Sequence, residues 1–242
     1  MSEEIEIMSV KIPIMTKDAA IDRIESLLDS KKGVRVFTPN PEMLLAAKDS
    51  SALAQMLNSA DLLLPDGIGI KIVSHMLGNP IPERISGIDM AFELLKIAET
   101  RRLSVFLLGG KPTVAERAAE KLVADLPSLN ICGTHHGYFD KSGKENQAVA
   151  EQIRKAAPDL LFVCFGFPAQ ERWICENLDS LPSVSLAMGL GGSLDVWSGD
   201  KKRAPKLVQR LCLEWLWRAS LEPKRLKIFI EIPRFLYLAA KK

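Results

Sequence analysis

Five short segments rich in glycine, proline and polar residues hold the side chains of this 242-residue chain that are best suited to chemistry. Each of them follows an apolar run. They are residues 38–42, 65–69, 109–112, 166–171 and 189–193. One such segment alone is more often a tight turn than a ligand site, whereas five in one chain favour a binding site.

Asp66 is the carboxylate that is best placed for a catalytic role. It lies between Pro65 and Gly67, directly after an apolar run. In that place a carboxylate can reach a bound hydroxyl group and act as a general base. An Asp before an apolar run can equally cap the following helix, so the pattern leaves both roles open.

Two interpretations are also open for Arg84, which lies between these segments, and for Gln170 and Glu171 within one of them. Arg84 stands beside a proline-containing turn, where an arginine can bind phosphate through paired hydrogen bonds, although most arginines lie on the solvated surface. Gln170 and Glu171 open a predicted helix, where a glutamate also complements the helix dipole. No GxxxxGKS/T phosphate loop or complete GxGxxG motif is present.

The histidines and cysteines argue against two classes of site. The three histidines have no metal-ligand spacing and build no nucleophile–histidine arrangement. The four cysteines form no CxxC pair, so we expect buried free thiols and no bound metal.

Apolar runs alternate with amphipathic stretches over the first 195 residues, as parallel strands and their crossover helices do. Predicted strands cover residues 34–38, 61–64, 104–108, 160–165 and 185–188. Predicted helices cover residues 18–28, 42–57, 89–99, 113–126, 147–156 and 170–178. The expected fold is α/β, with a Rossmann-like, mostly parallel sheet flanked by helices. Its ligand crevice should lie at the carboxyl ends of the strands.

The last part of the chain differs in charge. The formal net charge is +2, yet residues 200–242 carry twelve Lys/Arg and four Asp/Glu, which leaves the preceding part at −6. We therefore predict a catalytic domain over residues 1–197 and a basic, amphipathic helical appendage over residues 198–242, with Pro233 ending its second helix. Such an appendage suits an anionic membrane surface.

Neither a transmembrane segment nor a signal peptide is indicated, because long apolar stretches are absent and the chain begins Met1-Ser2-Glu3-Glu4. The expected location is cytoplasmic, as a peripheral protein on the inner face of the plasma membrane. The apolar tail could also pack on a neighbouring subunit, which leaves a homo-oligomer open.

The order of the motifs resembles the WecG/TagA/CpsF glycosyltransferases, over the chain from about Val10, and its teichoic-acid branch in particular. The segments that carry the resemblance are Thr38-Pro39-Asn40-Pro41-Glu42, Pro65-Asp66-Gly67-Ile68-Gly69, Arg84-Ile85-Ser86-Gly87-Ile88-Asp89, Leu107-Leu108-Gly109-Gly110, Gly137-Tyr138-Phe139, Gly166-Phe167-Pro168-Ala169-Gln170-Glu171, Gly192-Ser193-Leu194-Asp195 with Gly199, and Arg203-Ala204-Pro205 with Glu214-Trp215 and Glu222-Pro223.

The resemblance implies an inverting, metal-independent transferase without a cofactor. It would move N-acetylmannosamine from UDP-N-acetylmannosamine to the 4-hydroxyl group of GlcNAc-diphospho-undecaprenol, a polyprenyl-diphosphate-linked GlcNAc, in synthesis of the teichoic-acid linkage unit.

The resemblance also implies roles for particular residues. Asp66 would be the general base, Thr38 and Asn40 would orient sugar hydroxyl groups, Arg84 would hold a phosphate, and Gln170 would line the same pocket. The UDP-sugar would be bound by Gly109, Gly110, Tyr138, Gly166, Glu171, Gly191, Gly192 and Asp195. In the appendage, Arg218, Arg225 and Lys227 would contact phosphate or lipid.

The chain departs from the family in the appendage. The family commonly has another Arg where this chain has Ile228, so either Lys227 substitutes for it or two cations suffice. The apolar end, residues 235–238, suggests deep seating in the bilayer interface.

Two other functions stay open from the sequence. The donor could carry N-acetylmannosaminuronic acid or a hexose. From a different class, the chain could be a non-catalytic nucleotide- or nucleic-acid-binding module, but its acidic body opposes a nucleic-acid backbone, so no nucleic-acid partner is expected.

Overall fold

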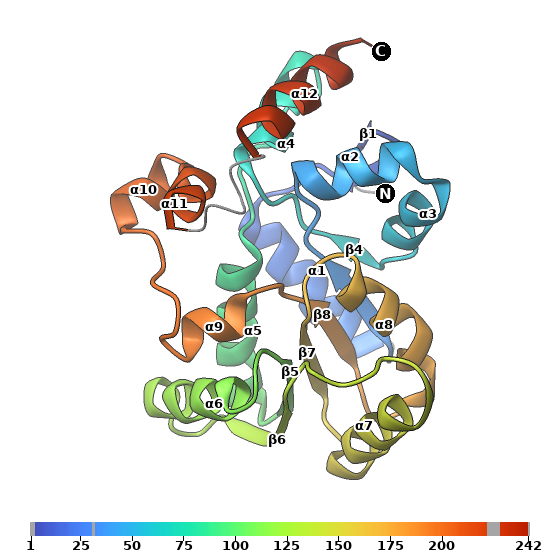
Figure 1. Ribbon diagram of the computed structural model, residues 1–242, viewed down its shortest axis with the longest axis vertical. Coiled ribbons are helices and arrows are strands. Elements are labelled where there is room, and N and C mark those ends of the chain that lie inside the picture. The colour runs from blue at the N-terminus through green and yellow to red at the C-terminus, as the bar shows by residue number, and fades with distance from the viewer. Residues whose placement is uncertain (1–2, 31, 222–227, 242) are drawn as a thin grey trace.

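The computed structural model describes residues 3–30, 32–221 and 228–241, and its centre is a six-stranded parallel sheet (Figure 1). The spatial order of its strands is β4-β3-β8-β7-β5-β6. Their bounds are β3 Val34–Phe37, β4 Leu62–Leu63, β5 Ser104–Gly109, β6 Asn130–His135, β7 Leu160–Cys164 and β8 Leu186–Gly189. All neighbouring strands pair in parallel, which confirms the expected α/β class.

Helices cover both faces of the sheet because side chains alternate between the faces along each strand. In β7, Leu160 and Phe162 join one core, and Leu161 and Val163 join the other. The first core includes α1 (Lys17–Ser30), α5 (Gly87–Arg101), α6 (Val114–Asp125) and α9 (Ser193–Trp197). The second includes α2 (Pro41–Asp49), α3 (Ser51–Asn58), α4 (Ile68–Met76), α7 (Gly143–Ala156) and α8 (Ala169–Asn177), after which a 3-10 turn, η1, spans Leu178–Ser180.

A β-hairpin precedes the sheet and was not predicted. Strands β1 (Glu4–Ile7) and β2 (Val10–Pro13) pair antiparallel, and their alternating buried and exposed residues are the signal that the sequence analysis missed. The hairpin is fixed to α3, since Asn58 accepts a hydrogen bond from the Lys11 amide and donates one to the Ser9 carbonyl.

The structure corrects one further prediction and adds two elements that were not predicted. The helix predicted over residues 42–57 is two helices, because Ser50 ends α2 and its hydroxyl group accepts from the Leu53 amide at the start of α3. Strand β6 and helix α4 were not anticipated. Their sequences include glycine and, in β6, polar residues, which weaken the apolar periodicity.

The appendage contains α10 (Lys206–Arg210), α11 (Glu214–Leu221) and α12 (Ile228–Ala240). Pro233 lies inside α12, so the prediction that it ends this helix is wrong. Proline removes one helical hydrogen bond, and the packing of α12 against α2 and α4 offsets that loss. Phe235 is fully buried in this contact, so it packs on the body and is not available to a bilayer.

None of the helices in the described ranges is both long enough and apolar enough to cross a membrane.

Candidate active site

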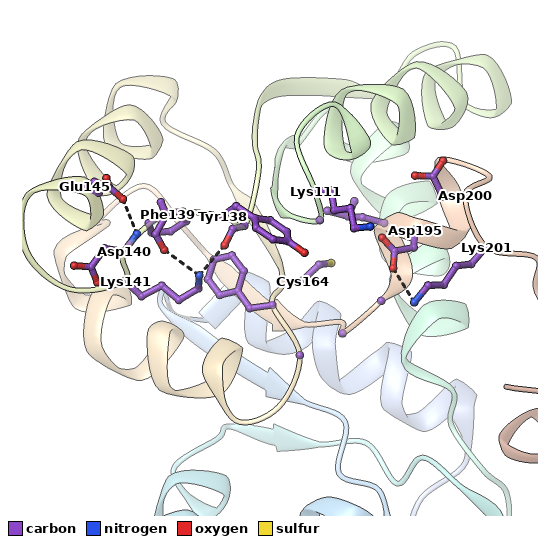
Figure 2. Close-up of a pocket in the computed structure, with 17 residues that line it drawn as sticks. Lys111, Tyr138, Phe139, Asp140, Lys141, Glu145, Cys164, Asp195, Asp200 and Lys201 are labelled. Carbon is purple, nitrogen blue, oxygen red and sulfur yellow. Dashed lines mark hydrogen bonds and ion pairs between the residues drawn. The ribbon is translucent and has the colours of Figure 1, made fainter. Parts of the chain in front are cut away.

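A large cavity lies at the carboxyl ends of β5, β6, β7 and β8, and we call it the glycine-rich cavity (Figure 2). Its volume is about 1000 Å³. The residues that line it are Gly110, Lys111, Gly137, Tyr138, Phe139, Asp140, Lys141, Glu145, Cys164, Phe165, Gly166, Gly191, Gly192, Leu194, Asp195, Asp200 and Lys201. Of the eight residues predicted to bind a UDP-sugar, the six that line this cavity are Gly110, Tyr138, Gly166, Gly191, Gly192 and Asp195.

Backbone packing shapes the floor of the glycine-rich cavity. Gly109 has φ +138°, and a Cβ there would overlap the carbonyl group of Cys164. The Gly137 amide donates to the Gly110 carbonyl at 2.8 Å. Only glycine allows the loop after β5 to lie this close to β7, so Gly109 contributes by close packing and does not line the cavity.

Lys141 fixes the loop that carries Tyr138. Its ammonium group donates to the carbonyl groups of Gly137 (2.7 Å) and Phe139 (3.3 Å), and it lies 4.5 Å from the centroid of the Phe165 ring. Burial lowers the pKa of Lys141. Tyr138 is left 66% exposed at the cavity wall, where its ring is accessible to a planar ligand (Figure 2).

Charged side chains form the opposite wall. Lys201 pairs with Asp195 at 3.1 Å, and Arg117 pairs with both oxygens of Asp200, at 2.5 and 2.7 Å. Lys111 also extends from the loop after β5 into this region (Figure 2). The cavity therefore combines glycine backbone with cations, the chemistry that binds phosphate groups.

A second, smaller cavity of about 130 Å³ lies at the carboxyl ends of β3 and β4, and we call it the charged cavity. The residues that line it are Asn40, Pro41, Glu42, Asp66, Gly67, Ile68, Gly69, Arg84, Ser86, Cys212, Glu214, Trp215, Glu231 and Ile232. It brings together three of the predicted catalytic residues, Asn40, Asp66 and Arg84, with residues of the appendage.

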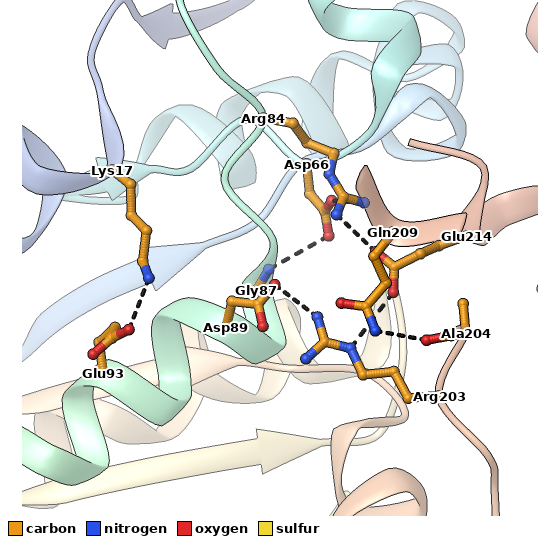
Figure 3. Close-up of polar contacts among 10 residues, drawn as sticks. All are labelled: Lys17, Asp66, Arg84, Gly87, Asp89, Glu93, Arg203, Ala204, Gln209 and Glu214. Carbon is orange, nitrogen blue, oxygen red and sulfur yellow. Dashed lines mark hydrogen bonds and ion pairs between the residues drawn. The ribbon is translucent and has the colours of Figure 1, made fainter. Parts of the chain in front are cut away.

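A chain of ion pairs runs from this cavity into the appendage (Figure 3). Arg84 Nη1 lies 3.7 Å from Asp66 Oδ1, and Arg84 Nη2 lies 2.7 Å from Glu214 Oε2. Arg203 then lies 3.6 Å from Glu214 and 2.7 Å from Asp89. Glu214, 5% exposed, thus joins α11 to two arginines.

The charged groups of these linked ion pairs stabilise one another. Burial disfavours the charged form of Arg84, but Asp66 and Glu214 outweigh it, so the pKa of Arg84 is raised. Burial likewise disfavours ionised Asp89, but the hydrogen bond and charge of Arg203 outweigh it and lower the pKa of Asp89. Arg84 and Asp89 therefore both stay ionised near neutral pH.

Asp66 contacts the start of the helix α5. Its Oδ2 accepts from the Gly87 amide, 3.4 Å away, at the first residue of α5, whereas the N-cap position of α4 is held by Gly67. This geometry leaves Asp66 in the charged cavity beside Arg84, at the edge where a hydroxyl group could be bound.

Thr38 and Asn40 lie close to Asp66. Asn40 caps α2, since its Oδ1 accepts from the Met43 amide at 3.0 Å, and it still lines the charged cavity. The Thr38 side chain packs against Gly87, where a Cβ would come within 3.1 Å of it. Gly87 therefore allows α5 to begin directly beside Thr38.

Gln170 and Glu171 line neither cavity. Both are buried, at 4% and 0% exposure, beneath the loops that follow β7 and β8. The side chain of Gln170 is thus not part of the lining of either cavity, and the contact of Glu171 with a UDP-sugar stays a prediction. Their place in sequence at the start of a helix does not distinguish a side chain that faces a cavity from one beneath it.

Of the predicted appendage contacts, Arg218 belongs to α11, and Arg225 and Lys227 lie outside the described residues. The sequence analysis did not assign roles to Arg203, Glu214 or Lys141. Arg203 and Glu214 belong to segments that carry the family resemblance, but only the fold shows that Glu214 joins Arg203 to Arg84.

Within the described ranges, no three or more His, Cys, Asp or Glu side chains gather in a way that could hold a metal ion.

Comparison with known proteins shows the family of this chain. Residues 5–242 match the family described as "Glycosyl transferase WecG/TagA/CpsF family". A Bacillus subtilis (strain 168) protein named N-acetylglucosaminyldiphosphoundecaprenol N-acetyl-beta-D-mannosaminyltransferase is 37% identical over 91% of this chain and 85% of its own length. A Staphylococcus aureus (strain NCTC 8325 / PS 47) protein of the same name is 35% identical over 98% of this chain and 92% of its own length. The chain therefore belongs to the WecG/TagA/CpsF glycosyltransferase family.

Proposed function

We propose that this chain transfers N-acetylmannosamine from UDP-N-acetylmannosamine to the 4-hydroxyl group of GlcNAc-diphospho-undecaprenol, with inversion at the anomeric carbon. The observation that carries the proposal is the match, over almost the entire chain, to relatives named for this transfer. Two cavities at the carboxyl edge of one sheet support it, since the reaction needs a site for each substrate.

The glycine-rich cavity takes the UDP moiety in this proposal. Tyr138 stacks on the uracil ring, Asp195 binds ribose hydroxyl groups, and the loops at Gly110, Gly166 and Gly191 accept the diphosphate. Backbone amides and lysines stabilise the negative charge that develops on the leaving UDP, which makes a metal ion unnecessary.

Asp66 is the proposed general base of the charged cavity. It takes the proton of the acceptor 4-hydroxyl group as that oxygen attacks the anomeric carbon and the bond from this carbon to the diphosphate breaks. Arg84 binds a substrate phosphate through its planar guanidinium group, and Thr38 and Asn40 orient sugar hydroxyl groups.

The lipid acceptor suggests that the protein works at the inner face of the plasma membrane. The exposed apolar residues Phe229, Ile230 and Tyr237 of α12 support a peripheral contact with an anionic bilayer. Sedimentation with anionic vesicles tests this: Ile230→Asp should lower the bound fraction and leave UDP affinity unchanged, and undiminished binding would contradict the contact.

A UDP-release assay tests the reaction. A synthetic lipid-diphosphate-GlcNAc acceptor is combined with UDP-N-acetylmannosamine, the corresponding uronate and UDP-hexoses, each with and without EDTA. We expect release with UDP-N-acetylmannosamine at equal rates in both conditions. Release that requires a divalent metal would overturn the metal-free mechanism, and release only with another donor would overturn the assigned sugar.

A further inference from the structure

The first residues of α8 connect two loops of the glycine-rich cavity. Gln170 Oε1 accepts from the Gly166 amide at 3.1 Å and from the Gly191 amide at 2.8 Å. Gly166 follows β7, Gly191 follows β8, and both line the cavity. One buried amide oxygen therefore joins two cavity walls that are 25 residues apart in sequence.

Glu171 determines which way this amide faces. Gln170 Nε2 donates to Glu171 Oε1 at 2.8 Å. A glutamine amide donates through its nitrogen and accepts through its oxygen. Because the Glu171 carboxyl oxygen accepts from Gln170 Nε2, Gln170 Oε1 must face the two glycine amides. Burial raises the pKa of Glu171, and a neutral carboxyl group still accepts this bond through its carbonyl oxygen.

The surrounding backbone leaves little room for another arrangement. A Cβ on Gly189, the last residue of β8, would lie 2.8 Å from Gln170 Nε2. Gly166 and Gly191 have φ values of +82° and +54°, a region that residues with side chains rarely adopt. The amide thus holds both loops where their conformations depend on glycine.

We propose that Gln170 is a positioning residue that sets the separation of the two glycine loops, and that Glu171 orients its amide. Gln170 does not touch the ligand. It holds the two loops in place, so that the other groups of these loops face the site proposed for a nucleoside diphosphate, and in naming that ligand the inference rests on the proposed function.

Hydrogen exchange of the protein without ligand tests the positioning directly. In Gln170→Ala, amides near Gly166 and Gly191 should exchange at least about tenfold faster than in the wild type, because each loses its hydrogen-bond acceptor. Unchanged exchange at both loops would overturn the proposal, whether or not the chain binds UDP.

Calorimetric titration with UDP tests the consequence for binding. Gln170→Ala should weaken UDP binding about tenfold, the effect of losing one or two neutral hydrogen bonds. In turnover assays the KM for the donor should rise and the KM for the acceptor should stay constant. If the wild type binds no UDP, the proposed function fails, and the exchange experiment still decides the positioning.

Two further variants separate positioning from general packing. Gln170→Glu removes the donor to Glu171 and should weaken UDP binding. The exchanged pair Gln170→Glu/Glu171→Gln restores all three hydrogen bonds, with donor and acceptor of the side-chain pair exchanged, and should recover most of the affinity. Lack of recovery in a folded double variant would overturn the role assigned to Glu171.

Asn177→Ala is the matched control. Asn177 is a buried amide at the other end of α8, bonded to Asn146 and Trp173. We expect it to lower Tm and to leave UDP affinity unchanged. If Asn177→Ala and Gln170→Ala weaken UDP binding equally, Gln170 acts through stability alone and the proposal fails.

Discussion

The two cavities of this protein differ in volume and in the parts of the chain that line them. The glycine-rich cavity is wide, and its lining residues all fall between 110 and 201. The charged cavity is narrow, and its lining comes from residues 40–86 and from 212–232 in the appendage. The first is formed mainly by loops of the α/β body, with Asp200 and Lys201 from the start of the appendage at one wall. The second is completed by side chains of the appendage helices, which join it to the body.

This difference predicts that the two binding steps are separable. A backbone-lined site needs few side-chain interactions to keep its shape, whereas a site held by buried ion pairs loses its geometry when one partner is removed. Changes in the charged cavity should therefore impair transfer and spare UDP binding. Changes at Tyr138 should weaken binding of the UDP-sugar and spare binding of the acceptor.

Asp66→Asn should have the largest effect. Loss of a general base costs about a hundredfold or more in kcat, while the UDP dissociation constant should stay within about twofold, because Asp66 lines only the charged cavity. UDP-release kinetics and calorimetry on the same preparation measure both. Turnover within a few fold of wild type would remove Asp66 as the base.

Glu214→Gln should have the second-largest effect on transfer. The change leaves Arg84 and Arg203 without their shared carboxylate, so we expect about a tenfold lower rate of transfer and a loss of about 1–3 kcal/mol in the free energy of unfolding. Chemical denaturation and the transfer assay measure the two effects.

Glu151→Gln is the control for this ion pair. Glu151 pairs with Arg154 on the exposed surface of α7, and its loss should cost less than about 1 kcal/mol. Equal effects of the two variants would mean that the Glu214 contact has no special role at the charged cavity.

Tyr138→Ala should act on the donor alone. Removing an aromatic ring that stacks on a base costs about 1 kcal/mol at an exposed position, or about a fivefold higher KM for the UDP-sugar. Tyr138→Phe keeps the ring and should behave as the wild type. A raised KM for the lipid acceptor would show that the two cavities are not independent.

Two cysteines give the smallest and most local test, since Cys164 lines the glycine-rich cavity and Cys212 the charged one. Burial raises the pKa of Cys164 to about 12, so its thiolate stays scarce up to pH 9. Maleimide at pH 8 should spare Cys164, and its modification of Cys212 should slow transfer and spare UDP binding. Mass spectrometry locates the label, and Cys212→Ala should be resistant.

The loops that form the site could be predicted because each follows an apolar run that becomes a strand. The sequence analysis placed them at one edge of the sheet, and β3, β4, β5, β7 and β8 are all present. Their division into two cavities depends on the order of the strands, which arises from long-range pairing. Alternation of residue types along the chain carries no information about that order.

The direction in which a side chain points is the second feature that could not be predicted from the sequence. Gln170 and Asp66 both stand in polar segments after strands, yet Gln170 faces inward to backbone amides and Asp66 lines a cavity. Glu214 and Arg203 are charged residues in a basic appendage, where a solvated surface position is the ordinary expectation. Only the docked position of α11 reveals their contact with Arg84.

The position of β8 has a consequence for folding during synthesis. Among the strands of the described residues it is the last to leave the ribosome, yet it lies between β3 and β7 in the middle of the sheet. Until residues 186–189 emerge, β3 with β4 and β5 with β6 and β7 have no strand to join them. The nascent chain therefore holds two unfinished half-sheets with open edges, a state open to mispairing, and insertion of one four-residue strand unites the two halves of the site.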